Sequence, residues 1–313
     1  MENKKIIVLT IFISLSISIF PQLRLANIFG DGMVLQRNDS INIWGWSKSG
    51  DKVSIIFHGD EYNTISNNEG KWLIQTKHYL AGGPFSLKIK TQKEEIYIKD
   101  IYVGDVWLCS GQSNMHMKMK SVKENYPEEF NLTENKNIRF IEVPSQLNFK
   151  KSEQDIKNSN WSSLNSKSIF KFSAAAFFFA KDLQPKLNIP IGLILSAVGG
   201  SPVESWISEK SALNYKSVAK RLNEAKQDGF LENLQKKDKE NRQNWFLEAE
   251  EKVLNNDVIY QPRSFDHTYK YKWFPFHKHT GVYWFKKEFY LDENLISDTR
   301  LYLGKIGDSD STF

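Results

Sequence analysis

The sequence predicts a multidomain protein with both α and β structure, and three observations along its 313 residues support this fold class. Short segments that alternate apolar and polar residues, separated by turn clusters, indicate an N-terminal β-sandwich over residues 21–101. A strand, helix, strand pattern then predicts an α/β layer over residues 102–258. Strand-like sequence returns after Pro262 and indicates a further β module over residues 259–313.

The first twenty residues have the pattern of a secretory signal peptide. Lys4 and Lys5 form a basic start, and an almost entirely apolar run follows over residues 6–20. This run is shorter than the roughly 20 apolar residues of a membrane span. We therefore expect a signal peptide over residues 1–20, no stable membrane span, and a secreted or periplasmic bacterial protein. A retained N-terminal anchor is the alternative.

The composition argues against nucleic-acid binding. The formal net charge is +5, from 42 basic and 37 acidic side chains, and the charge is mild and spread along the chain. Nine Trp and twelve Tyr would suit stacking on carbohydrate, although such residues more often fill the core. The only cysteine, Cys109, allows no internal disulfide, which fits a bacterial periplasm or outer surface better than an animal secretory route.

Alternation of apolar and polar residues locates the strands of the N-terminal region. Turn clusters rich in Gly, Asn, Ser and Pro separate these segments. The expected strands cover residues 41–46, 53–57, 71–75, 85–90 and 95–101.

The pattern changes in the α/β region. A helix is predicted over residues 167–183, ending before Pro185, and buried strands are predicted on either side of it. Residues 208–254 are charged and helical in character, which favours a solvated pair of helices over a partner-binding surface. The expected strands are 102–109, 139–143 and 191–196, and one side of the predicted helix carries Phe172, Ala175, Phe179 and Leu183.

Ser113 is the candidate nucleophile. The strand predicted over residues 102–109 ends abruptly, and Ser113 follows between two amide side chains, Gln112 and Asn114. A hydroxyl at the carboxyl end of a strand, where a helix begins, lies beside backbone N–H groups that stabilise a developing negative charge. The layout favours acyl transfer, and a structural turn is the alternative.

Two glycines follow the strand predicted over residues 191–196. In an open α/β sheet the carboxyl ends of the strands border the ligand crevice. Gly199 and Gly200 would let the backbone come close to a ligand and direct N–H groups at an oxyanion. An ordinary tight turn is the alternative.

The segments Gly111–Met115 and Gly199–Trp206 together resemble the sialate O-acetylesterases, carbohydrate esterases of the SGNH hydrolase superfamily. The similarity extends along nearly the whole chain. Further segments that carry it are 31–37, 102–107, 172–175, 190–194, 281–287 and 303–310.

The resemblance implies a fold and a site. Residues 102–258 would form an incomplete, flavodoxin-like SGNH hydrolase domain, and residues 259–313 a truncated β-galactosidase-type, galactose-binding-like jelly-roll insert. Ser113 would be the nucleophile, and its own N–H and that of Gly199 or Gly200 would form the oxyanion hole. The substrate would be O-acetylated sialic acid or another acetylated carbohydrate, and no cofactor is implied.

The family's base comes from an Asp-x-x-His segment and a further oxyanion donor from a Gln-Gly-Glu-Ser-Asn segment, and the 313 residues contain neither. His116 follows Ser113 by three residues and would share its side of a helix, but no carboxylate partner is evident for it. His267, His277 and His279 are expected to have surface or packing roles. The resemblance therefore implies a chain that is truncated at its carboxyl end and inactive or nearly so.

Two alternatives to a sialate O-acetylesterase stay open. One is a deacetylase of plant polysaccharide such as acetylated xylan, and the other is a secreted, non-catalytic carbohydrate-binding protein. No metal is implied, because His277 and His279 are two residues apart and no third ligand is evident. The sequence leaves the oligomeric state open.

Overall fold

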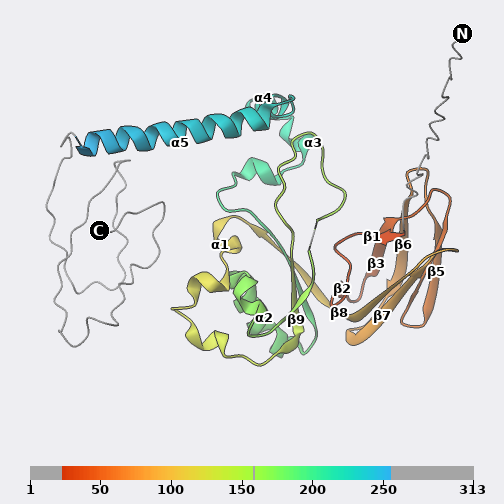
Figure 1. Ribbon diagram of the computed structural model, residues 1–313. Coiled ribbons are helices and arrows are strands. Elements are labelled where there is room, and N and C mark those ends of the chain that lie inside the picture. The colour runs from red at the N-terminus through yellow and green to blue at the C-terminus, as the bar shows by residue number, and fades with distance from the viewer. Residues whose placement is uncertain (1–22, 158, 255–313) are drawn as a thin grey trace, which may run out of the picture. The chain divides into compact units, whose positions relative to one another are not determined.

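The computed structural model describes residues 23–157 and 159–254 (Figure 1). The predicted signal peptide and the predicted jelly-roll residues 259–313 lie outside these ranges. Two compact units, residues 1–227 and 228–313, are treated separately. In the described part of the chain, no helix has the length and apolar character that crossing a bilayer requires.

Two sheets form the N-terminal part of the first unit. The smaller has the order β1-β3-β6, and the larger contains β8-β7-β4-β5. Their inner faces share one apolar core, which includes Ile43 and Trp72 from the first sheet and Phe57 and Ile89 from the second. The strands are β1 (Arg24–Leu25), β3 (Ser40–Trp46), β4 (Lys52–Phe57), β5 (Asp60–Ile65), β6 (Lys71–His78), β7 (Gly82–Lys90) and β8 (Glu95–Gly111).

The five strands expected in this region are present. Strands β1, β2 (Val34–Gln36) and β5 are additions, and the longest of them is β5. Its sequence, Asp-Glu-Tyr-Asn-Thr-Ile, is almost wholly polar, so no apolar alternation marks it. It pairs with β4 alone at the edge of the sheet, where polar residues are tolerated on both faces. Backbone pairing, rather than burial, therefore determines this strand.

The strands predicted over residues 95–101 and 102–109 are one continuous strand, β8, of 17 residues. Its first part pairs antiparallel with β7. Residues 102–104 pair in parallel with β2 (Val34–Gln36), and residues 105–111 pair in parallel with β11 (Ile191–Ala197). The boundary expected between residues 101 and 102 therefore falls inside a strand that serves both layers.

The second half of β8 is less buried than predicted. Among the described strands, only β11 pairs with residues 105–111, so this stretch forms a sheet edge. Leu108 is 68% exposed and Trp107 is 43% exposed. The apolar sequence of this stretch correctly predicted a strand, but the prediction of burial was wrong for Trp107 and Leu108.

A parallel layer continues the sheet beyond β8. Strand β11 lies between β8 and β9 (Asn135–Glu142) and is parallel to both, and the short β10 (Ser162–Leu164) pairs antiparallel with β9. Helix α2 (Ala174–Leu187) lies against this sheet (Figure 1). The core between them contains Phe177 and Ala180 of the helix and Leu193 and Leu195 of β11.

Helix α2 differs from its prediction at both ends and in its buried face. A 3₁₀ turn, η3 (Ser168–Lys171), precedes it, and Ser173 caps it by accepting a hydrogen bond from the Ala176 N–H. Pro185 lies inside the last turn, where few backbone hydrogen bonds remain to be lost, and Asn188 ends the helix in the left-handed conformation. The prediction that the helix ends before Pro185 was wrong.

The buried face of α2 is formed by Ala176, Phe177, Ala180 and Gln184. Ala175 and Phe179, which were expected along the same side as Phe172, are exposed. The small side chains of Ala176 and Ala180 let the helix approach the sheet, whereas the ring of Phe179 lies outside and contacts Trp107, with ring centroids 4.9 Å apart.

Arg139 connects the two layers through a buried guanidinium group that is only 2% exposed. Its Nη1 and Nη2 donate to the two carboxylate oxygens of Asp100 at 2.7 and 3.1 Å, and Nη1 also donates to the Gly32 carbonyl at 3.0 Å. Nε donates to the Lys136 carbonyl at 2.8 Å, and the group stacks over Tyr102 at 4.2 Å from the ring centroid. A bidentate pair of this kind holds β9 against β8.

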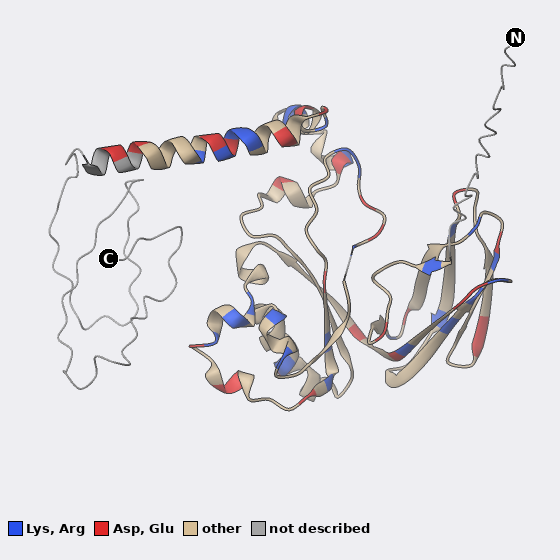
Figure 2. Ribbon diagram, in the orientation of Figure 1, with Lys and Arg blue, Asp and Glu red and all other residues tan. Residues whose placement is uncertain are grey.

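Helices occupy most of residues 208–254, as the charged sequence there predicted, and one further short helix precedes them. In the first unit they are η4 (Val203–Trp206), α3 (Glu209–Ala212) and α4 (Lys216–Ala225). The second unit contains α5 (Phe230–Leu254), which carries charged side chains of both signs along its length (Figure 2). Short helices elsewhere are α1 (Ser113–His116), η1 (Met119–Val122) and η2 (Pro127–Phe130).

Replacing Arg139 tests the connection between the layers. Arg139→Met should lower the free energy of unfolding by about 2 kcal/mol or more, because it leaves the Gly32 and Lys136 carbonyls without their donor and removes the partner of Asp100. Urea denaturation measures the change. Arg221→Met is the matched control, because its exposed ion pair with Glu204 should contribute about 0.5 kcal/mol or less. Equal losses in the two variants would contradict this role for Arg139.

Candidate active site

Ser113 lies where β8 ends and α1 begins, as the sequence predicted. Strand β8 ends at Gly111, whose φ of +145° is a conformation that other residues rarely adopt. Helix α1 is a single turn, with Gln112 at its N-cap and no side-chain cap. The first N–H groups of such a turn have no acceptor within the helix, so they are available to a ligand.

The two predicted motifs lie side by side because β8 and β11 are parallel and end in register. Ala197 is paired with Gly111, and the Val198 N–H donates to the Gly111 carbonyl at 3.0 Å. The side chain of Gln112 donates to the Ser201 carbonyl at 2.8 Å. The segment after β11 is thereby fixed against the segment that carries Ser113.

Only one of the two glycines faces Ser113. A Cβ atom placed on Gly199 would lie 3.8 Å from the Ser113 Cα and 3.7 Å from the His116 Nδ1. A Cβ atom placed on Gly200 would have no neighbour within 4 Å, and Gly200 instead has a φ of +75°. Gly199 thus borders the serine, whereas Gly200 shapes the turn. Among the described residues, the Gly199 N–H donates no hydrogen bond.

His116 has a carboxylate neighbour that sequence reasoning missed. Its Nε2 is 4.0 Å from Oε1 of Glu142, the last residue of β9, so the statement that His116 lacks an acidic partner is wrong. The same oxygen is 2.7 Å from the Lys118 Nζ, although the angles there are not those of a hydrogen bond. Glu142 lies 26 positions from His116 in the sequence, and only the parallel pairing of β9 with β11 brings it to this end of the sheet.

Ser113, His116 and Gly199 meet at one place, which we call the serine corner. The hydroxyl of Ser113 has no hydrogen-bond partner among residues 23–157 and 159–254. His58 and His78 belong to the N-terminal sheets, and His267, His277 and His279 lie outside the described residues. His116 is therefore the imidazole that the described structure places at the serine corner.

Cys109 does not compete with Ser113 as a nucleophile. It lies in the core between β8 and α2, two residues before the end of the strand. Burial raises the pKa of its thiol to about 11, so the group is protonated at neutral pH.

The exposed indole of Trp206 is connected to the serine corner through Ser201. Trp206 is 40% exposed, and its Nε1–H donates to the Ser201 hydroxyl at 2.9 Å. Because Gln112 holds the carbonyl of the same Ser201, the indole is fixed to the residue that precedes Ser113. Sequence analysis did not select Trp206, and its position depends on the fold of the 198–206 segment.

A known family is similar to the part of the chain that contains the serine corner. Residues 103–235 match the family described as carbohydrate esterase, sialic acid-specific acetylesterase. The sialate O-acetylesterases of Pongo abelii and Homo sapiens are each 31% identical to the chain over 205 residues, which is 60% of this chain and 39% of theirs. The chain therefore spans about two fifths of the length of these curated relatives.

Among solved structures, a carbohydrate acetylesterase from Xanthomonas citri is similar to this chain. The TM-score is 0.58 at 28% sequence identity, over 62% of this chain and 44% of that one. The two motifs, the parallel strands that carry them and the similarity to these relatives all indicate a carbohydrate esterase. Residues 103–235, which contain both motifs, are similar to the sialic acid-specific acetylesterase family of carbohydrate esterases.

Proposed function

We propose that this protein is a serine-dependent carbohydrate O-acetylesterase that removes acetyl groups from O-acetylated sialic acid or a related sugar. The observation that carries the proposal is the meeting of Ser113 and Gly199 at the carboxyl ends of β8 and β11. A nucleophile and an oxyanion donor from two neighbouring strands are the minimum that acyl transfer needs.

The reaction follows from these positions. The Ser113 oxygen attacks the acetyl carbonyl, and the N–H groups of Ser113 and Gly199 stabilise the negative oxygen of the tetrahedral intermediate. The bond to the sugar oxygen breaks, the sugar leaves as an alcohol after taking a proton, and an acetyl group remains on Ser113. Water then attacks this ester and releases acetate.

Ser113 must lose its proton during the attack, because a neutral hydroxyl is a poor nucleophile. Among the described side chains, His116 is the candidate acceptor, with Glu142 near its far nitrogen to stabilise the imidazolium. The Lys118 Nζ lies 2.7 Å from the same Glu142 oxygen, so the carboxylate is shared between Lys118 and His116. The arrangement gives the serine corner a base and a carboxylate even though no Asp-x-x-His segment occurs in the 313 residues.

We also propose that the protein is exported. Lys4, Lys5 and the apolar run over residues 6–20 support a secretory signal.

Ser113→Ala tests the nucleophile. It should lower kcat for hydrolysis of p-nitrophenyl acetate by about 10⁴-fold or more, because the substitution removes the attacking oxygen. Ser110→Ala is the matched control: Ser110 is exposed, lies in β8 three residues before Ser113 and should change the rate by about twofold or less. Acetate release from O-acetylated sialic acid and from acetylated xylan, measured in parallel, identifies the preferred sugar. Equal rates for wild type and Ser113→Ala would refute the proposal.

The two glycines should respond differently to an added methyl group. Gly199→Ala places a Cβ between Ser113 and His116, so kcat should fall by about tenfold or more while stability changes little. Gly200→Ala leaves that space open but forces alanine into a φ of +75°, so the unfolding free energy should fall by about 1 kcal/mol with kcat nearly unchanged. Steady-state kinetics and urea denaturation measure both. A larger kcat loss in Gly200→Ala would contradict the assignment of Gly199.

A further inference from the structure

Two neighbouring cavities border the three-stranded sheet of the first unit. Their volumes are about 440 and 480 Å³. The outer face of β3 contributes Trp46 to the first and Trp44 to the second, and residues 151–156 line both. Neither cavity is lined by Ser113, His116 or Gly199, although Val143 of the second cavity directly follows Glu142, so binding there can be measured separately from hydrolysis.

The two indoles lie on the same face of one strand. Along β3, Ile41, Ile43 and Gly45 are buried, whereas Trp44 and Trp46 alternate with them and are partly exposed. Residues two apart on a strand are separated by about 7 Å. The pair therefore presents two aromatic surfaces in a row, one in each cavity.

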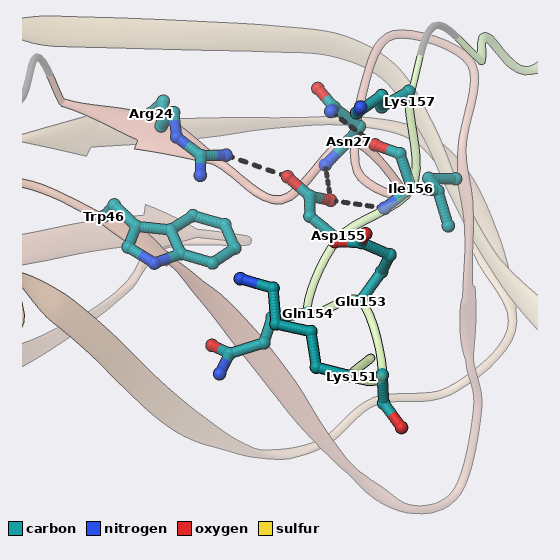
Figure 3. Close-up of a pocket in the computed structure, with 10 residues that line it drawn as sticks. Arg24, Asn27, Trp46, Lys151, Glu153, Gln154, Asp155, Ile156 and Lys157 are labelled. Carbon is teal, nitrogen blue, oxygen red and sulfur yellow. Dashed lines mark hydrogen bonds and ion pairs between the residues drawn. The ribbon is translucent and has the colours of Figure 1, made fainter. Parts of the chain in front are cut away.

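Contacts on the protein side fix both rings. The Arg24 guanidinium stacks over Trp46 at 3.6 Å from the ring centroid, and Figure 3 shows it above the indole. Phe29 meets Trp44 edge to face, with ring centroids 4.7 Å apart. Rings that are already oriented lose little conformational entropy when a ligand stacks on them.

Asp155 fixes the segment that forms the opposite wall. Its carboxylate accepts hydrogen bonds from Arg24 Nη1 and the Asn27 N–H, both at 2.8 Å, and from the Ile156 N–H at 2.9 Å (Figure 3). The Asn27 side chain donates to the Ile156 carbonyl at 2.5 Å. These hydrogen bonds fix residues 151–156 relative to β3, so the cavities are part of the folded structure.

Most of the other residues that line the cavities are polar, and some of their side chains have hydrogen-bond donors and acceptors without a partner in the described structure. In the described part of the chain, the side chains of Gln146, Lys151 and Gln154 make no hydrogen bond. Arg24, by contrast, is paired with Asp155. Aromatic surfaces bordered by amide groups suit a ligand that has apolar C–H faces and many hydroxyl groups.

We propose that the two cavities form an accessory binding site for a neutral carbohydrate chain, with one sugar ring on Trp46 and the next on Trp44. Gln146, Lys151 and Gln154 donate or accept hydrogen bonds to the hydroxyl groups. The site holds the protein on a glycan and carries out no chemistry.

Binding of defined oligosaccharides tests the site. Calorimetric titration of the full chain with xylohexaose, cellohexaose and sialyllactose should show binding of at least one neutral hexasaccharide that is tighter than that of the charged sialyllactose. Trp46→Ala and Trp44→Ala should each weaken this binding by about tenfold or more. Trp206→Ala is the matched control, because this exposed indole lies beside Ser201 and outside both cavities, and its Kd should stay within about twofold.

Two further measurements distinguish loss of the binding site from misfolding and from loss of esterase activity. The double variant Lys151→Ala/Gln154→Ala changes only wall side chains without hydrogen bonds, so it should keep the fold and still weaken binding by about threefold or more. Hydrolysis of p-nitrophenyl acetate by Trp46→Ala should stay within about twofold of wild type. Absence of hexasaccharide binding, or binding lost in Trp206→Ala and kept in Trp46→Ala, would overturn the accessory site and leave the esterase proposal untouched.

Discussion

Strand β8 has three partners along its length, and the rest of the first unit depends on this pairing. Its first half completes a sheet of the N-terminal core, and its second half is the edge of the parallel layer. The strand ends at Gly111, so the position of Ser113 is set by a rigid element whose other end is anchored in a separate core. Residues at the end of such a strand are held more closely than residues on a free loop.

The serine corner follows from parallel pairing. Strands β8, β11 and β9 run in the same direction, so Ser113, Gly199 and Glu142 emerge at one end of the sheet. Gln112 then joins the two loops through Ser201. Arg139 supports the same geometry, because its hydrogen bonds to Asp100 and Gly32 hold β9 to the layer that anchors β8. Local chemistry at Ser113 therefore rests on contacts between residues far apart in the sequence.

Much of this arrangement could be predicted from local patterns. The motifs at Ser113 and Gly199 were recognisable because turn glycines directly follow apolar strands, and parallel strands end at a common edge. Strand β5 was missed because edge pairing requires no apolar alternation. The buried face of α2 was predicted incorrectly because the small residues Ala176 and Ala180, rather than Phe179, decide which side approaches the sheet. The partners of Arg139 and His116 were out of reach, since both depend on strand pairing.

The most direct test of the account is to find where an acetyl group becomes attached. Brief incubation with p-nitrophenyl acetate, followed by acid quenching, digestion and mass spectrometry, locates the covalent acetyl-enzyme. The account predicts one acetyl group on the peptide that contains Ser113, with less of it in Gly199→Ala because the added methyl group lies beside Ser113 and His116. Acetylation confined to lysine side chains, with Ser113 unmodified, would contradict it.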